Sequence, residues 1–179
     1  MNILTLNYEY PPLGGGAAPV SRDIAEKLAE LGHKVTVLTM SFEDLPEHEE
    51  EGNLEIFRVK CKRSKKSSCS VLESYTYMLD VMKFMKQHKE LQEYDVCHAH
   101  FVIPVGFVAR QIKRKYHIPY IITAHGTDVE GYNPKPVLKC MHRVLRSTWR
   151  SIVNESAAIV TPSAFLLGLM NKAYESGKY

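Results

Sequence analysis

Short apolar runs alternate along the chain with segments in which apolar residues recur every three or four positions. A short apolar run is typical of a buried strand, and the wider spacing is typical of a helix with one buried face. Strands are predicted at residues 3–6, 35–39, 54–59, 95–100, 118–124 and 157–161, and helices at about 19–31, 70–94, 104–115, 137–155 and 162–174. This alternation, without tandem repeats, predicts an α/β fold with a doubly wound, mostly parallel sheet and helices on both faces.

Two parts of the pattern carry further expectations. Residues 42–53 are acidic and polar and contain no predicted element, and the strand at 54–59 is expected to lie at an edge of the sheet. The helix at 70–94 is predicted to turn an apolar face toward the core, where its methionines fill space. The residues expected on that inner face are Leu72, Tyr75, Leu79, Met82 and Met85.

Composition narrows the class of protein without identifying the function. Of the 179 residues, 45% are hydrophobic, which is enough for one folded domain. The formal net charge of +3 is too small to indicate a nucleic-acid partner. No stretch reaches the roughly 18 apolar residues of a membrane span. The four cysteines form no C-x-x-C pair, so we expect reduced thiols, no cysteine-bound zinc and a cytoplasmic location.

A glycine loop joins the first predicted strand to the first predicted helix. Pro11 and Pro12 cannot donate backbone hydrogen bonds, so the strand must end before them. Gly14, Gly15 and Gly16 then remove every side chain from the turn. Their N–H groups and the N-terminus of the helix form a concavity that suits a phosphate or a carboxylate. A flexible turn without a ligand explains the same glycines.

Two well-known phosphate-binding motifs do not fit this loop. Pro19 stands where the third glycine of a dinucleotide G-x-G-x-x-G motif belongs, and no acidic residue ends the second predicted strand. No Lys-Ser or Lys-Thr follows the glycines, so the loop is not a Walker loop. A nicotinamide or flavin dinucleotide is therefore a weak interpretation.

Polar side chains also follow the fourth and fifth predicted strands, and ligands of such sheets bind at the carboxyl ends of strands. His98 and His100 share one strand face, and His125 offers a third metal ligand, but no metal-binding motif supports a metal over histidines that are simply buried or exposed. Gly126 permits an unusual turn after His125, and Asp128 is close enough to orient an imidazole or accept a substrate hydroxyl. A polar transition from strand to loop is the alternative.

Four motifs together resemble a known family. They are residues 11–16 (PPLGGG), 95–101 (DVCHAHF), 118–128 (IPYIITAHGTD) and 157–163 (AAIVTPS). In this order and spacing the chain resembles, over essentially its whole length, the N-terminal Rossmann-like domain of retaining GT-B glycosyltransferases of family four.

The resemblance implies one half of an enzyme that moves a sugar from a nucleotide-sugar donor to an acceptor, with retention of anomeric configuration and without a metal or other cofactor. Gly15 and Gly16, next to Gly14, match the loop whose N–H groups would approach the donor diphosphate or the acceptor. His125 matches the residue placed against the transferred sugar. Asp128, as a catalytic residue, and Glu9, as a substrate-binding residue, are weaker assignments.

The family's C-terminal, nucleotide-sugar-binding domain has no counterpart in residues 1–179. We therefore expect this chain to be the acceptor-side domain, hexosyltransferase activity to belong to a longer protein, and the isolated chain to be inactive. Two other hypotheses stay open: a non-catalytic sugar- or nucleotide-binding module and, more weakly, a dinucleotide oxidoreductase domain.

Basic residues form a stripe on the helix predicted at 137–155, opposite its apolar side chains. This stripe, like the basic segment at 60–66, suits the anionic inner face of a membrane or a phosphorylated acceptor. A solvated outer face explains it as simply. The basic residues are Lys139, Arg143, Arg146 and Arg150, and the apolar ones are Leu138, Met141, Leu145, Trp149 and Ile152.

Overall fold

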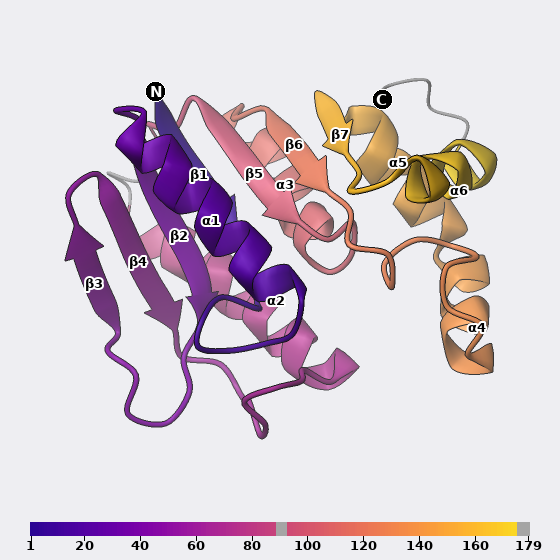
Figure 1. Cartoon of the computed structure of the whole chain (residues 1–179), viewed down its shortest axis with the longest axis horizontal. Helices are drawn as coiled ribbons and strands as arrows, with labels where there is room; N and C mark the ends of the chain where they lie inside the picture. The colour runs from indigo at the N-terminus through magenta and orange to yellow at the C-terminus, as the bar shows by residue number, and fades with distance from the viewer. Residues whose placement is uncertain (89–92, 175–179) are drawn as a thin grey trace.

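The computed structural model describes residues 1–88 and 93–174, which fold around one seven-stranded sheet (Figure 1). The strands are β1 (Asn2–Leu6), β2 (Lys34–Met40), β3 (His48–Glu51), β4 (Leu54–Val59), β5 (Val96–His100), β6 (Tyr120–Thr123) and β7 (Ala158–Val160). The helices are α1 (Ala17–Glu30), α2 (Val71–Gln87), α3 (Val105–Tyr116), α4 (Pro136–Val144), α5 (Arg146–Glu155) and α6 (Ala164–Tyr174).

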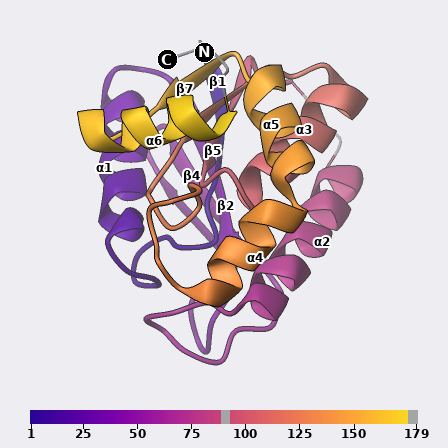
Figure 2. The same ribbon diagram turned by 90° about the vertical axis from the view of Figure 1, so that its right-hand side faces the viewer.

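The sheet has the order β3-β4-β2-β1-β5-β6-β7, and every pair except β3 with β4 is parallel. Helices α1 and α6 cover one face, and α2, α3 and α5 cover the other (Figure 2). The predicted doubly wound, mostly parallel α/β fold is therefore confirmed. Because β1, β5 and β6 are parallel neighbours, their carboxyl ends meet at one edge of the sheet, where the loops that follow them begin.

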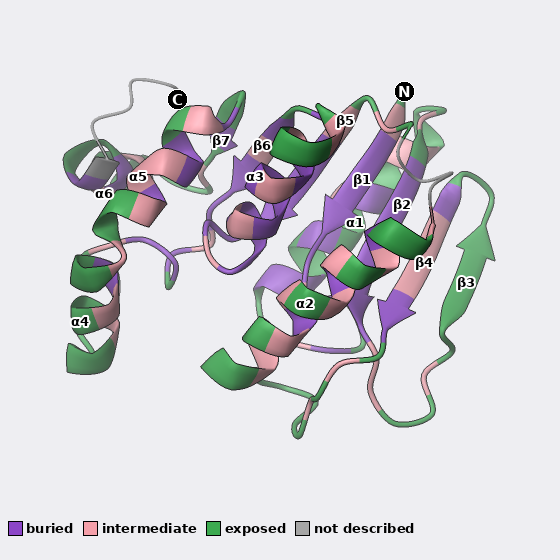
Figure 3. Cartoon of the chain, turned by 180° about the vertical axis from the view of Figure 1, so that it is seen from behind, coloured by how far each residue is buried: buried purple, intermediate pink, exposed green. Residues whose placement is uncertain are grey.

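The central strands are buried between the two helical layers (Figure 3). In β2, every residue after Lys34 is buried, as parallel strands covered on both faces require. Two buried tyrosines tie helices to the sheet: the Tyr77 hydroxyl of α2 donates to the Leu38 carbonyl at 2.7 Å, and the Tyr120 hydroxyl of β6 donates to the Ile152 carbonyl at 2.5 Å. Both hydroxyls are thereby satisfied inside an apolar core.

The prediction that residues 42–53 contain no element is wrong at their end. Residues 48–51 form β3, which pairs antiparallel with β4 and takes the edge position expected for β4. All four residues of β3 are exposed, so the strand has no hydrophobic alternation to reveal it. Backbone pairing with β4 forms the strand, and two side-chain contacts cross the hairpin: an ion pair between Arg58 and Glu49 and a hydrogen bond between His48 and Glu55 at 2.9 Å. Charged edge strands of this kind also resist pairing with other chains.

The prediction of one helix over 137–155 is also wrong, because the segment forms two helices that meet at Leu145. Leu145 leaves helical geometry, with φ −94° and ψ 10°. Trp149, Ile152 and Val153 anchor α5 in the core, whereas His142 is the buried residue of α4. The predicted basic stripe is thus divided, and α4 lies away from the sheet (Figure 1).

The inner face predicted for α2 is largely its outer face. Leu72, Tyr75 and Leu79 are 71%, 52% and 54% exposed. Of the residues predicted to face inward, Met85 is buried and Met82 packs against the core. Tyr77 and Val81, which were not predicted, are buried beside Met85. The helix has apolar residues on both sides, so spacing alone did not identify the buried one. It ends at Gln87, and the part of the predicted helix at 89–92 lies outside the described residues.

Candidate active site at the carboxyl ends of the strands

The loops after β1, β5 and β6 are joined by a row of ring contacts. Tyr8 stacks on Phe101 with ring centroids 4.9 Å apart, and Phe101 lies 4.6 Å from the ring of His125. The His125 ring in turn lies 5.3 Å from the ring of His100, which lies 4.4 Å from that of His98. The row brings the end of β1 and the predicted imidazole to the same place at the sheet edge.

The glycine loop is shaped by Gly14 and left open at Gly15 and Gly16. Gly14 has φ +95°, and a Cβ there would lie 2.5 Å from the Cβ of Glu9, so only glycine fits. Its N–H donates to the Lys66 carbonyl at 2.8 Å. A Cβ on Gly15 or Gly16 would meet nothing within 4 Å. Gly16 caps α1 without a side-chain hydrogen bond, so the start of the helix offers backbone N–H groups to an anion.

Glu9 contacts the glycine loop directly. Its Oε2 accepts a hydrogen bond from the Gly15 N–H at 3.3 Å, so a carboxylate already lies at one of the loop's donors. The backbone N–H of Glu9 donates to Oδ1 of the buried Asn7, whose Nδ2 donates to Ser21 of α1 at 2.8 Å. Asn7 and Ser21 therefore fix the loop to the helix. Sequence reasoning missed both residues, because neither belongs to a named motif.

The three histidines hold one another and the neighbouring strand. Nδ1 of His100 lies 3.1 Å from Nε2 of His125, and Nε2 of His98 lies 2.8 Å from the Thr123 hydroxyl. Burial lowers the pKa of His98 to about 4, and burial with the neighbouring His98 and His125 lowers the pKa of His100 to about 2. Both rings are therefore neutral near pH 7. Within residues 1–88 and 93–174, no three His, Cys, Asp or Glu side chains are grouped as metal ligands.

Asp128 is buried, and its carboxyl group holds the backbone around His125. Oδ1 accepts from the N–H groups of His125 and Gly126 at 3.0 and 2.8 Å, and Oδ2 accepts from the Val102 N–H at 2.7 Å. Burial raises the pKa of Asp128, and these N–H donors act in the opposite direction. No described hydrogen bond joins its carboxyl group to the His125 ring. Asp128 thus orients the imidazole through the loop on which it stands.

Two further residues fix this loop and were not predicted. Trp149 of α5 donates its Nε1–H to the Asp128 carbonyl at 2.8 Å. Phe101 has φ +80°, an unusual conformation for a bulky residue, and its carbonyl accepts from the Gly106 N–H at 3.1 Å. Gly126 has φ +110°, and a Cβ there would lie 2.8 Å from the Tyr132 ring. The predicted need for glycine after His125 is therefore explained by its backbone.

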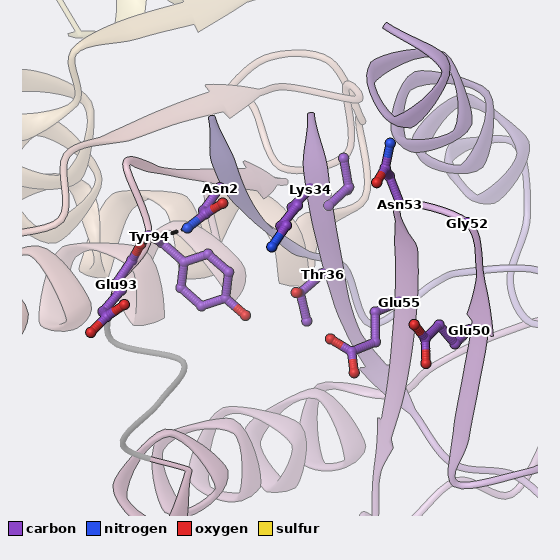
Figure 4. Close-up of a pocket in the computed structure, with 10 residues that line it drawn as sticks. Asn2, Lys34, Thr36, Glu50, Gly52, Asn53, Glu55, Glu93 and Tyr94 are labelled. Carbon is purple, nitrogen blue, oxygen red and sulfur yellow. Dashed lines mark hydrogen bonds between the residues drawn. The ribbon is translucent and has the colours of Figure 1, made fainter. Parts of the chain in front are cut away.

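A separate cavity of about 300 Å³ lies at the opposite end of the strands, where β1 and β2 begin (Figure 4). Asn2, Lys34 and Tyr94 are among its lining residues. None of the predicted site residues lines it. The candidate site described above is therefore distinct from this cavity.

The fold is a Rossmann-like α/β domain, and solved glycosyltransferase structures share it. A sucrose-phosphate synthase from Thermosynechococcus elongatus has a TM-score of 0.73 over 97% of this chain and 45% of its own, at 13% identity. The catalytic domain of starch synthase IV from Arabidopsis thaliana has a TM-score of 0.63 over 97% of this chain and 50% of its own, at 12% identity. These likenesses concern the fold.

The family follows from the sequence. The model of Glycosyltransferase Family 4 matches residues 14–176, and the chain belongs to this family. An uncharacterised glycosyltransferase of Methanocaldococcus jannaschii is 30% identical over 137 residues, which cover 72% of this chain and 32% of the relative. N-acetyl-alpha-D-glucosaminyl L-malate synthase of Bacillus anthracis is 24% identical over 163 residues, 86% of this chain and 41% of the relative. The chain thus spans about a third to two fifths of these relatives.

Proposed function

We propose that this chain is the acceptor-side half of an enzyme that transfers a sugar, with retention, from a nucleotide-sugar donor to an acceptor. The observation that carries the proposal is the row of rings from Tyr8 through Phe101 to His125. It joins the end of the strand before the open glycine loop to an imidazole at the same sheet edge. Membership in the glycosyltransferase family supports the same reaction class.

The two parts of the site suit the two charges that sugar transfer creates. Loss of the leaving group develops negative charge on a diphosphate and positive charge on the sugar ring. The Gly16 N–H and the start of α1 are placed to stabilise an anion, on the donor or on the acceptor, and the Gly15 N–H joins them once the Glu9 carboxylate, now 3.3 Å away, moves aside. His125, half-buried and neutral through the burial that lowers its pKa, serves as a hydrogen-bonding group beside the sugar. The reaction needs no metal in this scheme.

The donor is proposed to bind mainly to a second lobe that faces this edge. The relatives named above are more than twice as long as the part that this chain matches, which leaves room for such a lobe. We therefore expect the longer protein to be a hexosyltransferase and residues 1–179 alone to show negligible transfer.

A screen of the longer protein against a panel of nucleotide sugars tests this function, with release of the nucleoside diphosphate as the signal. His125→Ala is expected to lower kcat about 100-fold, because it removes a group from the reaction centre. His117→Asn is the matched control, since His117 is exposed at the end of α3 and its φ of +60° suits asparagine. Binding of nucleotide sugars without turnover supports the non-catalytic module instead. If the longer protein neither binds nor turns over any nucleotide sugar of the panel, the proposal is contradicted.

The exposed face of α2 favours peripheral contact with an anionic membrane. Leu72, Tyr75 and Leu79 lie on one outer stripe that continues into the exposed Lys83 and Lys86. Lys62, Lys65 and Lys66, in the loop just before the helix, are also exposed. An exposed apolar stripe with lysines before and after it along the chain is typical of a surface that enters the headgroup region of anionic lipids. Among the described residues no helix is long and apolar enough to cross a membrane.

The basic residues predicted for this role contribute unequally. Lys139 and Arg143 are exposed on α4, but Arg146 lies 3.6 Å from Glu130. In the earlier loop, Arg63 is occupied by the carbonyls of Tyr8, Lys65 and Lys66. The exposed face of α2, together with the five exposed lysines of this helix and of the loop before it, is therefore the better candidate.

Sedimentation with vesicles tests this surface. Binding is expected with vesicles of phosphatidylglycerol and phosphatidylcholine, weaker binding as salt rises, and none with phosphatidylcholine alone. The double variant Leu72→Gln with Leu79→Gln should weaken binding at least tenfold, since each leucine loses apolar burial. Leu31→Gln is the matched control, because Leu31 is 67% exposed at the end of α1. Failure to bind the anionic vesicles at any salt concentration contradicts the membrane role.

A further inference from the structure

The His100 ring is buried, and it has a single polar contact. The residue has no exposed surface, and its Nε2 is buried without a hydrogen-bond partner among the described residues. Its other nitrogen, Nδ1, lies 3.1 Å from Nε2 of His125, with the ring centroids 5.3 Å and the ring planes 19° apart, so the two rings meet edge to edge, as an in-plane N–H···N hydrogen bond requires. His100 therefore has one polar contact available, and that contact is the ring of His125.

Two neutral imidazoles share one proton in such a contact, and its position decides the tautomer of both rings. If Nδ1 of His100 carries the proton, His100 donates to His125 and its buried Nε2 is only an unused acceptor. If Nε2 of His125 carries the proton, the second proton must sit on Nε2 of His100, as a buried N–H without an acceptor. Among backbone groups, buried N–H donors without a partner are rarer than under-satisfied acceptors, and the same cost applies to a ring N–H. The first arrangement is therefore favoured.

We propose that His100 is a positioning residue that holds His125 in the tautomer protonated on Nδ1, by donating its own Nδ1–H to Nε2 of His125. Because His125 is half-buried and its Nδ1 has no partner among the described residues, the ring then presents an N–H to the open side. His125 acts as a hydrogen-bond donor toward a substrate oxygen and not as a general base. Only this role at the reaction centre rests on the proposed function; the hydrogen bond itself does not.

The neighbouring histidine of the same strand, His98, cannot fix the tautomer of His125 in this way. His98 lies two residues away on the same face of β5, but its Nε2 contacts the Thr123 hydroxyl. The hydroxyl can donate or accept, so it does not impose a tautomer. His98 therefore packs against His100 without dictating where the proton of His125 lies.

Long-range proton–nitrogen NMR of the histidine rings tests the proposal on the 179-residue chain, without substrate. In the unchanged protein at pH 7.5, His125 is expected as one tautomer, protonated on Nδ1. His100→Phe keeps a buried aromatic ring but removes the donor, so His125 should become a mixture of tautomers. His100→Asn is the conservative variant, because its side-chain amide places an N–H near the position of the histidine Nδ1, and it should restore the single tautomer.

Two results overturn the proposal: His125 protonated on Nε2 in the unchanged protein, or a tautomer that does not respond to His100→Phe while the fold is retained. If His100→Phe changed the His125 tautomer only through lost packing, His100→Asn, which also loses the ring, would not restore the single tautomer. A chain with the expected tautomer whose longer form neither binds nor turns over nucleotide sugars would refute the proposed function and leave this inference standing.

Discussion

The two loops that meet at the candidate active site are held in opposite ways. The loop after β6 has its polar groups committed: one carboxyl group accepts three backbone N–H groups, and Trp149 holds the Asp128 carbonyl. The loop after β1 leaves Gly15 and Gly16 exposed, with Glu9 as a contact at 3.3 Å. A rigid loop suits a group that must be positioned within a fraction of an ångström, and an open one suits a ligand that brings its own charge.

The largest loss of stability is expected from a substitution in the loop after β6. Asp128→Ala removes three hydrogen bonds to a buried carboxyl group and leaves their N–H donors without a partner, so the free energy of unfolding should fall by about 4 kcal/mol. Urea unfolding followed by circular dichroism measures it. Asp44→Ala is the control, because Asp44 is exposed, and it should change stability by less than about 0.5 kcal/mol. An equally small effect of Asp128→Ala would show that the loop is not held as described.

Acid should lower the stability of the protein through the buried histidines beside this loop. The folded pKa values of His98 and His100 lie below the ordinary value of 6.5, so these rings bind protons only when the chain unfolds. Their contribution to stability is therefore complete above pH 6.5 and is lost as the pH falls below it. Between pH 7.5 and 5.5 the two rings together should lower the free energy of unfolding by about 3 kcal/mol. Asp128 and His125 face the same cluster: burial lowers the pKa of His125 as well, which adds to the loss in acid, whereas burial raises the pKa of Asp128, which acts in the opposite direction.

Urea unfolding at the two pH values measures this loss. His98→Gln keeps a polar group near Thr123 but no longer titrates, so it should remove about half of the acid effect. His117→Asn, at an exposed position, should leave the effect unchanged. If His98→Gln and the unchanged protein lose the same stability on acidification, burial of these rings is not what makes the protein sensitive to acid.

The contrast also separates what the sequence could predict from what it could not. The buried strands were predicted because their apolar runs are local, and the fold and family are confirmed. Gly14 and His125 stood out because each follows such a strand. The support of the site was not predictable: Trp149 reaches Asp128 across 21 residues, and Phe101 reaches both Tyr8 and His125. Such contacts depend on the topology of the sheet, which no local pattern records.

The misassigned elements have the same origin. Strand β3 is stabilised by charge pairing with β4, and the break at Leu145 follows from anchoring Trp149 in the core while α4 departs from it. Helix α2 carries apolar residues on both its buried and its exposed side, and the periodicity selected mainly the exposed ones.

The smallest stability effect, and the sharpest comparison, comes from neighbouring glycines of one loop. Gly14→Ala should cost about 2 kcal/mol, because φ is +95° and the new Cβ would lie 2.5 Å from the Cβ of Glu9. Gly15→Ala should change stability by less than about 0.5 kcal/mol, since its Cβ would meet nothing within 4 Å. In the longer protein, however, Gly15→Ala should raise the KM of the nucleotide sugar or of the acceptor, because the methyl group would stand where we propose that the loop receives an anion. Thermal unfolding of the two variants beside their kinetics separates the roles: equal destabilisation would mean that the loop is shaped throughout and holds no open site, whereas a normal KM with unchanged stability in Gly15→Ala would place the anion elsewhere.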